Sequence, residues 1–339
     1  MLKIYFTLLQ EVNHDHPPLD HYINENQIRD AILKEIDANP FRTIRDVFDN
    51  YINNLPANDR QYAPAWQTFR PSLERRRAEN LPRIPHRVQD VRIQGAWRET
   101  RDGGEFLRKV DRHWGFASFS STAQMRALAD AEVIHIDATF KSTPRPYKQM
   151  LVIQARYLDH IVPVAYVFMK RRTMNDYRAV LRSLKTKCRR LLGRQLDPRI
   201  IVSDFEAGLV TALQFEFINA ESYGCYFHFC NALWKNVQKL GLKRPYRRDD
   251  RFRHFIRKVT ALAFIPRNFV LNNWNLLKGQ PGTVRLTQQY PDLRRFLHYF
   301  ESSYILGQFP IRQWNVHTRG LDTRTNNVQE GMIFYVHAT

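Results

Sequence analysis

The sequence has few cysteines and lacks any long apolar stretch. Its three cysteines cannot supply a disulfide framework for a chain of 339 residues, which favours a reducing compartment. No apolar run approaches the ~20 residues that a membrane-spanning helix requires, and the opening segment has no small-residue cleavage site. We therefore expect an intracellular protein with neither a signal peptide nor a membrane span.

Acidic residues are scarce relative to basic ones. The chain has 33 Asp and Glu against 52 Lys and Arg, a formal net charge of +19, and an excess of this size is typical of proteins that bind a polyanion. Hydrophobic residues reach 43%, which excludes a disordered chain. The composition predicts a folded protein with nucleic acid as its first-choice partner. An acidic membrane surface and a merely solvated basic face are the alternatives.

Residues 20–95 carry the pattern of three short helices. Isoleucines recur with helical spacing before Pro40, a second apolar face runs from Thr43 to about Leu55, and a third helix is predicted over Pro71–Asn80. Three helices ending in a basic one are typical of a helix-turn-helix-like module. We predict that this region binds DNA, and a helical cap on the next domain is the alternative. The predicted contacts are Arg75, Arg76 and Arg77.

Residues 125–242 have the pattern of a mixed sheet with helices. Three β-branched or aromatic runs of strand length come first, followed by helix, strand, helix, strand and helix. Short turns followed by crossover helices indicate a meander joined to parallel strands. We predict an α/β fold with a ribonuclease H-like mixed five-stranded sheet. Its strands are expected at Glu132–Phe140, Gln149–Leu158, Ile161–Met169, Arg199–Phe205 and Tyr223–Phe229.

Two aspartates end apolar strands, and a glutamate follows much later in the chain. Asp137 and Asp204 each follow a buried run, where a carboxylate is costly unless it is paired or binds metal; capping the following turn is the alternative role. Glu330 follows Thr325 and two asparagines that can cap a helix. These oxygen ligands suit Mg²⁺ or Mn²⁺ in a two-metal site. Glu206 is a rival ligand, but its spacing favours a helix N-terminus.

Four blocks of sequence occur in order: HIDATFK (135–141), IVSDFEAGL (201–209), GCYFHFCNALW (224–234) and RTNNVQE (324–330). Together they resemble the successive motifs of MULE (Mutator-like element) transposase domains. The resemblance covers roughly residues 132–330 and implies a nuclear DNA transposase that binds element ends and target DNA and is a homo-oligomer when active. It also implies that Asp137, Asp204 and Glu330 are the catalytic metal ligands, and that Cys225 and His228 are a Cys-x-x-His signature.

The interval between Asp204 and Glu330 is longer than a compact ribonuclease H sheet needs. We predict a helical insertion over residues 243–313 to fill it. Its first part, residues 243–258, contains eight Lys or Arg with aromatic residues between them, which is typical of phosphate contact. A solvated helix face is the alternative. The predicted DNA contacts are Lys243, Arg244, Arg247 and Arg248.

The two ends of the sequence depart from the family's pattern. Residues 1–19 are interpreted as the remnant of a zinc-finger-like segment, because two histidines stand there without preceding cysteines. Residues 314–339 are predicted to hold the third-acid helix and a truncated C-terminus, since poor helix formers follow Glu330. Zinc is not expected, because Cys225 and His228 lack a second ligand pair at zinc-site spacing. A domesticated, catalytically inactive DNA-binding protein and a stand-alone nuclease are the alternative functions.

Overall fold

The computed structural model describes residues 19–81, 85–140, 143–157 and 160–324. Residues 1–18 and 325–339, and with them Glu330, lie outside the described residues. The chain divides into two compact units, Met1–Arg83 and Ile84–Thr339. No helix among the described residues is both long and apolar enough to cross a membrane.

The first unit is a set of three helices around one small core. They are α1 (Leu19–Ala38), α2 (Ile44–Asn54) and α3 (Trp66–Asn80), with a 3-10 turn, η1 (Arg60–Tyr62), before the last. Thr43 caps α2 by accepting a hydrogen bond from the backbone of Asp46. The predicted start of the third helix is wrong: α3 begins at Trp66, so Pro71 lies inside it. Packing of Phe69 and Leu73 in the core outweighs the backbone hydrogen bond that the proline removes.

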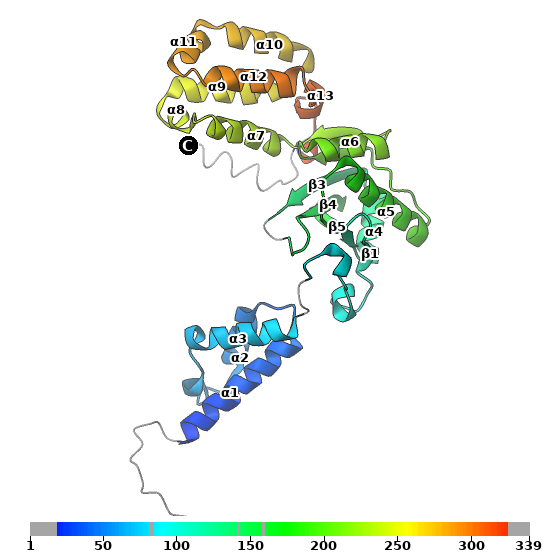
Figure 1. Ribbon diagram of the computed structural model, residues 1–339, viewed down its shortest axis with the longest axis vertical. Coiled ribbons are helices and arrows are strands. Elements are labelled where there is room, and N and C mark those ends of the chain that lie inside the picture. The colour runs from blue at the N-terminus through cyan, green and yellow to red at the C-terminus, as the bar shows by residue number, and fades with distance from the viewer. Residues whose placement is uncertain (1–18, 82–84, 141–142, 158–159, 325–339) are drawn as a thin grey trace, which may run out of the picture. The chain divides into compact units, whose positions relative to one another are not determined.

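The second unit contains a seven-stranded mixed sheet (Figure 1), in the order β1-β2-β5-β4-β3-β6-β7. Neighbouring strands from β1 to β3 are antiparallel, whereas β6 runs parallel to both β3 and β7. The predicted mixed α/β class is confirmed, and the predicted number of five strands is wrong. The strands are β1 (Leu107–Asp111), β2 (Phe116–Phe119), β3 (Val133–Thr139), β4 (Gln149–Tyr157), β5 (His160–Met169), β6 (Ile200–Ser203) and β7 (Glu221–Gly224).

The two strands that the sequence pattern missed form a hairpin at the edge of the sheet. β1 has no clear alternation because its Arg108 side chain is buried and paired with Glu105, and β2 has only four residues. Gly115 joins them with a φ of 69°, which favours glycine. Two short 3-10 turns, η2 (Val88–Asp90) and η3 (Gly95–Arg98), precede the hairpin.

The predicted fifth strand is also too long. Its chain leaves the sheet at Gly224, and helix α7 (Tyr226–Lys239) begins two residues later. Phe229 and Leu233 lie one helical turn apart and are fully buried in a second core. Tertiary packing therefore outweighs the β-propensity of this aromatic stretch.

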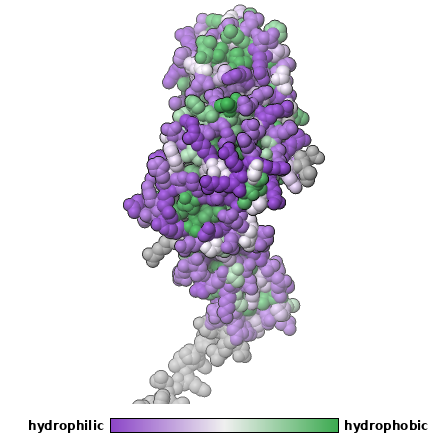
Figure 2. Space-filling view, turned by 90° about the vertical axis from the view of Figure 1, so that its right-hand side faces the viewer, coloured by the Kyte–Doolittle hydropathy of each residue, from purple (hydrophilic) through white to green (hydrophobic). Residues whose placement is uncertain are grey.

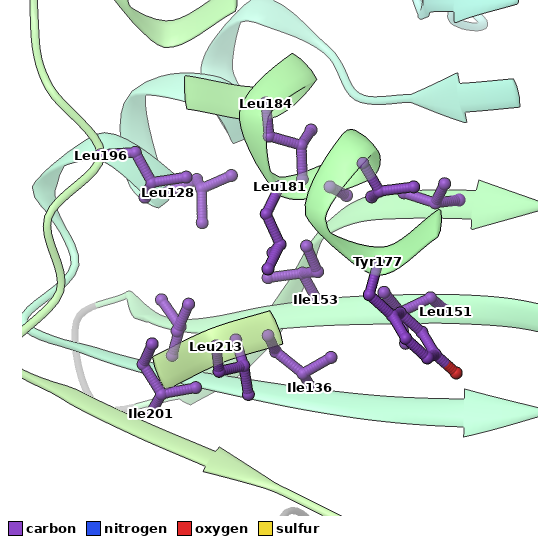
Figure 3. Close-up of a cluster of buried hydrophobic side chains, with 14 of the residues drawn as sticks. Leu128, Ile136, Leu151, Ile153, Tyr177, Leu181, Leu184, Leu196, Ile201 and Leu213 are labelled. Carbon is purple, nitrogen blue, oxygen red and sulfur yellow. The ribbon is translucent and has the colours of Figure 1, made fainter. Parts of the chain in front are cut away.

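Three helices pack on the sheet: α4 (Thr122–Asp130), α5 (Met174–Leu192) and α6 (Ala207–Glu216). Thr173 and Asp176 form a reciprocal capping box at the start of α5. In Figure 3, the apolar side of α5, with Tyr177 and Leu181, lies over Ile136 and Ile153 of the central strands. This core fixes the two strands that end in the predicted acids.

Helices also make up the rest of the described chain. Their aromatic core includes Trp314, which stacks on Phe229 at 5.0 Å between ring centroids, and Trp274, which packs on Phe300. The elements are α8 (Lys243–Arg248), α9 (Asp250–Ala261), η4 (Leu262–Phe264), α10 (Arg267–Gly279), α11 (Pro281–Gln289), α12 (Leu293–Phe300), a π-helical turn η5 (Glu301–Ile305), α13 (Ile311–Trp314) and η6 (Leu321–Thr323).

Candidate functional site

Asp137 and Asp204 lie side by side at the carboxyl ends of two adjacent parallel strands. In the pairing of β3 with β6, Ile136 is opposite Ser203. Asp137 is the next residue of β3, and Asp204 is the first residue after β6. Side chains at equivalent positions of paired strands project from the same face of the sheet. The negative charge of Asp137 contributes to raising the pKa of Asp204, which places the two carboxylates within electrostatic reach.

Asp204 is held in a half-buried position by the turn into α6. Burial is the largest cause of its raised pKa, and the charge of His228, the backbone N–H of Glu206 and the charge of Arg172 act in the opposite direction. The Glu206 N–H donates to Asp204 Oδ1 at 3.2 Å. Bringing two carboxylates together away from water is unfavourable unless a cation accompanies them.

His228 supplies a positive charge between these acids. It lies in the first turn of α7, with Nε2 3.5 Å from Asp137 Oδ1. Burial disfavours its charged form, but the side chain of Cys225 and the charges of Asp137 and Asp204 outweigh burial and raise the pKa of His228 to about 9. These neighbours favour the protonated imidazole. We call Asp137, Asp204, Glu206 and His228 the acid site.

The Glu206 side chain hydrogen-bonds Tyr177 rather than capping its own helix. It is the N-cap residue of α6 but makes no side-chain cap hydrogen bond. Burial raises the pKa of Glu206, and a hydrogen bond from the Tyr177 hydroxyl opposes that shift. The same hydroxyl accepts a hydrogen bond of 2.8 Å from Gln149 Nε2. Sequence reasoning missed Tyr177 and Gln149, although a buried tyrosine hydroxyl normally needs a partner.

Phe205, between the two acids of this turn, fixes the turn to the helical core. Its ring lies against Gly224, where a Cβ atom would come within 2.1 Å of the ring. The ring also packs edge-on against Tyr304 and Phe309. Glycine at position 224 is therefore required by the close approach of Phe205, and the position of Asp204 depends on that contact.

Gly208 allows a second close approach beside the acid site. A Cβ atom at this position would lie 3.0 Å from the carbonyl oxygen of Arg172, in the turn before α5. The Arg172 guanidinium stacks over Phe140 at 5.3 Å and acts electrostatically on Asp204 and Glu206. Arg172 is thus a second cation at the acid site that the sequence pattern did not reveal.

The last described segment returns to the start of α7. Arg319 is buried, stacks on the Tyr223 ring at 4.0 Å and donates from Nη1 to the Gly224 carbonyl at 2.9 Å. The Arg324 carbonyl accepts a hydrogen bond of 2.8 Å from the Tyr226 backbone N–H. The chain therefore leaves the described region next to Cys225 and His228.

Some of the other predicted site residues pair with neighbours within the protein, and others are exposed to solvent. Arg76 pairs with Asp37, and Arg77 donates to three backbone carbonyls at the end of α1, whereas Arg75 is exposed. Within the described residues, no ion pair is recorded for the four exposed cations of α8, which are Lys243, Arg244, Arg247 and Arg248. Their role in DNA binding stays a prediction.

The described part of the chain does not contain a complete set of metal ligands. Among residues 19–324, apart from the internal gaps, no three His, Cys, Asp or Glu side chains are arranged to hold a metal ion. Cys225 is buried and hydrogen-bonds His228. The predicted third acid, Glu330, cannot be placed because it lies outside the described residues.

Comparison with known proteins identifies the segment that contains the acid site. Residues 133–232 match the family model described as MULE transposase domain, which confirms the resemblance seen in the sequence. The match runs from β3 into α7 and includes Asp137, Asp204, Cys225 and His228. A search of curated proteins gave no significant match.

Proposed function

From the MULE transposase domain at residues 133–232, we propose that this protein is a DNA transposase whose acid site cuts and joins DNA strands with two divalent ions, Mg²⁺ or Mn²⁺. The observation that carries the proposal is the place of the two acids: Asp137 follows Ile136 on β3, Asp204 follows Ser203 at the end of the adjacent parallel strand β6, and both act electrostatically on His228. When bound, two such ions activate the attacking oxygen and stabilise the leaving oxygen of an in-line phosphoryl displacement.

The order of the central strands supports a ribonuclease H-like assignment. The part β5-β4-β3-β6-β7 is an antiparallel meander joined to two parallel strands. β2 and β1 extend this arrangement beyond β5. In this view the seven-stranded sheet is the family's core with a hairpin added at one edge, far from the acids.

The donor set fits hard divalent cations. Asp137 and Asp204 offer carboxylate oxygens, which Mg²⁺ and Mn²⁺ prefer, and Asp204 is desolvated beside a like charge. Tyr177 orients Glu206 as a further oxygen donor beside them. His228 places positive charge next to the acids, so a bound cation and the protonated imidazole would compete for the same carboxylates.

Glu330 completes the proposed set of ligands. It is six residues beyond Arg324 in the sequence, and Arg324 lies at the start of α7, beside the acid site. Mutation can test the role of Glu330, because Glu330→Gln removes the negative charge of the side chain and keeps its volume.

DNA is the proposed substrate and partner. The net charge of +19 and the exposed cations of α8 supply the phosphate contacts that sequence-independent DNA binding requires. We further propose that the protein acts in the nucleus and assembles as a homo-oligomer when active. A catalytically inactive DNA-binding protein is not favoured, since both aspartates are present and adjacent.

A nicking assay on labelled duplex DNA tests the proposal. We expect Mg²⁺-dependent cleavage that falls by about a hundredfold or more in Asp137→Asn, Asp204→Asn and Glu330→Gln. Asp197→Asn is the matched control, because Asp197 is an exposed aspartate outside the acid site. Cleavage that persists in the Asp204→Asn protein, or that needs no divalent ion, would refute the assignment.

A further inference from the structure

A groove of about 560 Å³ lies between the edge strand β1 and helix α5. Its lining includes one acidic side chain, Asp111, and six basic ones. This position is separate from the acid site, because β2, β5 and β4 lie between β1 and β3 in the sheet. We call it the α5 groove. Its basic residues are Arg108, Lys109, Arg178, Arg182, Lys187 and Arg190.

The groove's floor is one face of α5. The apolar residues of this helix, such as Tyr177 and Leu181, point into the core, and the side that lines the groove carries small residues at helical spacing. These are Asn175, Ala179, Ser183 and Thr186. From Asn175 to Arg190 the helix rises about 22 Å, which equals about six base pairs at ~3.4 Å each. Small side chains on the helix, with long basic side chains beside them, suit an extended polymer with regularly repeated negative charges.

The acids near the groove do not neutralise its cations. Arg178 and Arg182 share a single carboxylate oxygen of Glu216, at 2.8 and 2.9 Å. Arg108 and Lys109 each have one acidic partner. Lys187 and Arg190 form no ion pair with another described residue. The surplus of positive charge is therefore greatest toward the C-terminal half of α5.

The groove begins close to the acid site. Arg172, which acts electrostatically on Asp204 and Glu206, is three residues before Asn175, where the lining of the groove starts. A nucleic acid strand that passes the acids can thus continue along α5. Figure 2 shows a surface that is mostly hydrophilic, with separate apolar patches.

We propose that the α5 groove binds the phosphate backbone of duplex DNA next to the segment held at the acid site. The inference rests on DNA being the substrate, and it adds where the flanking duplex lies and which residues hold it. Phosphates match the positive charge of the lining, to which the α5 residues Arg178, Arg182, Lys187 and Arg190 contribute most, since Arg108 is buried and paired with Glu105. Binding there is expected to be independent of sequence and sensitive to salt.

Fluorescence anisotropy with a labelled duplex of about 30 base pairs tests the proposal, using the full chain with Asp204→Asn and no divalent ion. We expect Lys187→Ala/Arg190→Ala to weaken binding about tenfold and to lower the slope of log K against log salt by about 2, because each lost phosphate contact removes about 0.9. Arg285→Ala/Arg294→Ala, which removes two exposed arginines elsewhere, should leave affinity and slope nearly unchanged.

A second pair of variants distinguishes an effect of charge on DNA binding from an effect of misfolding. Thr186→Glu places a negative charge on the groove floor, and Thr186→Gln has nearly the same size without charge; both sit at an exposed position. We expect only Thr186→Glu to weaken binding. Equal effects of the two substitutions, an unchanged salt slope in the double variant, or a groove-dependent preference for RNA or an acidic peptide over duplex DNA would overturn the proposal.

The outcome for the groove is independent of catalysis. If groove variants lose DNA affinity while the unaltered chain shows no metal-dependent nicking, the transposase chemistry fails and the groove stands. If nicking is present and depends on Asp204, but groove variants bind DNA as the unaltered chain does, the groove proposal fails alone.

Discussion

The acid site and the α5 groove differ in how their charges are held. In the acid site, like charges are brought together in a half-buried position, and the turn that carries Asp204 is fixed by the contact of Phe205 with Gly224. In the groove, opposite charges are spread over a helix face and pair through long side chains near solvent. The first site depends on packing and the second on charge, so different substitutions should affect each.

The largest effect is expected from Gly224→Ala. The new methyl group would overlap the Phe205 ring, and overpacking of this kind costs about 1–3 kcal/mol. Displacing Phe205 also moves the adjacent Asp204, so nicking should fall by about a hundredfold. Thermal unfolding and the nicking assay measure the two effects. Gly282→Ala is the control, because a Cβ there meets nothing within 4 Å; equal behaviour of both variants would show that the turn is not held by this contact.

A smaller effect is expected from Tyr177→Phe. The substitution removes the hydroxyl shared by Glu206 and Gln149, and a buried polar group left without a partner costs about 1–3 kcal/mol. Nicking should fall roughly tenfold, as expected for a positioning residue, while DNA affinity is unchanged. Tyr157→Phe alters an exposed tyrosine and should do neither. Full activity of Tyr177→Phe would mean that the orientation of Glu206 is irrelevant to the chemistry.

Replacing the four α8 cations by alanine should change binding and leave the acid site intact. Lys243, Arg244, Arg247 and Arg248 are exposed, so the fold should be retained and the salt slope should fall by up to ~0.9 per contact. The control exchanges the same four residues between Lys and Arg, which keeps the charge. An unchanged slope in the alanine protein would remove α8 from the DNA-binding surface.

The smallest effect is expected in the pH dependence of stability without metal. The folded-state pKa of His228 is raised from 6.5 to about 9, so its contribution to stability is full below about pH 6.5 and is lost as the pH rises through about 9. The unaltered chain should therefore lose more thermal stability between these values than His228→Gln does. Identical pH profiles for the two proteins would show that the imidazole carries no charge between the acids.

The positions of the two aspartates, one on a strand and one directly after a strand, could be predicted from local sequence pattern. An apolar run that ends in Asp137 or Asp204 has a period and composition that indicate a buried strand, and two such strands run parallel when a crossover helix joins them. The edge hairpin was not predictable in this way, because Arg108 occupies a buried position in β1 and interrupts the alternation of apolar and polar residues.

Contacts between distant segments could not be predicted from local pattern. The turn at Asp204 is held by Gly224 and Tyr304, and the end of the described chain by Arg319 on Tyr223. None of these pairs is close in the sequence. The start of α7 was missed for the same reason, since burial of Phe229 in the helical core decides between helix and strand.

Iron-mediated cleavage of the polypeptide tests the central claim most directly, because it locates a bound divalent ion without relying on activity. Fe²⁺ replaces Mg²⁺ in oxygen-ligand sites, and the radicals it generates with peroxide and ascorbate cut the chain nearby. We expect cuts close to Asp137 and Asp204 that excess Mg²⁺ suppresses and that Asp204→Asn abolishes, with a further cut near Glu330 if it is the third ligand. Cuts confined to other regions, or an unchanged pattern in the Asp204→Asn protein, would contradict a metal-binding acid site at the ends of β3 and β6.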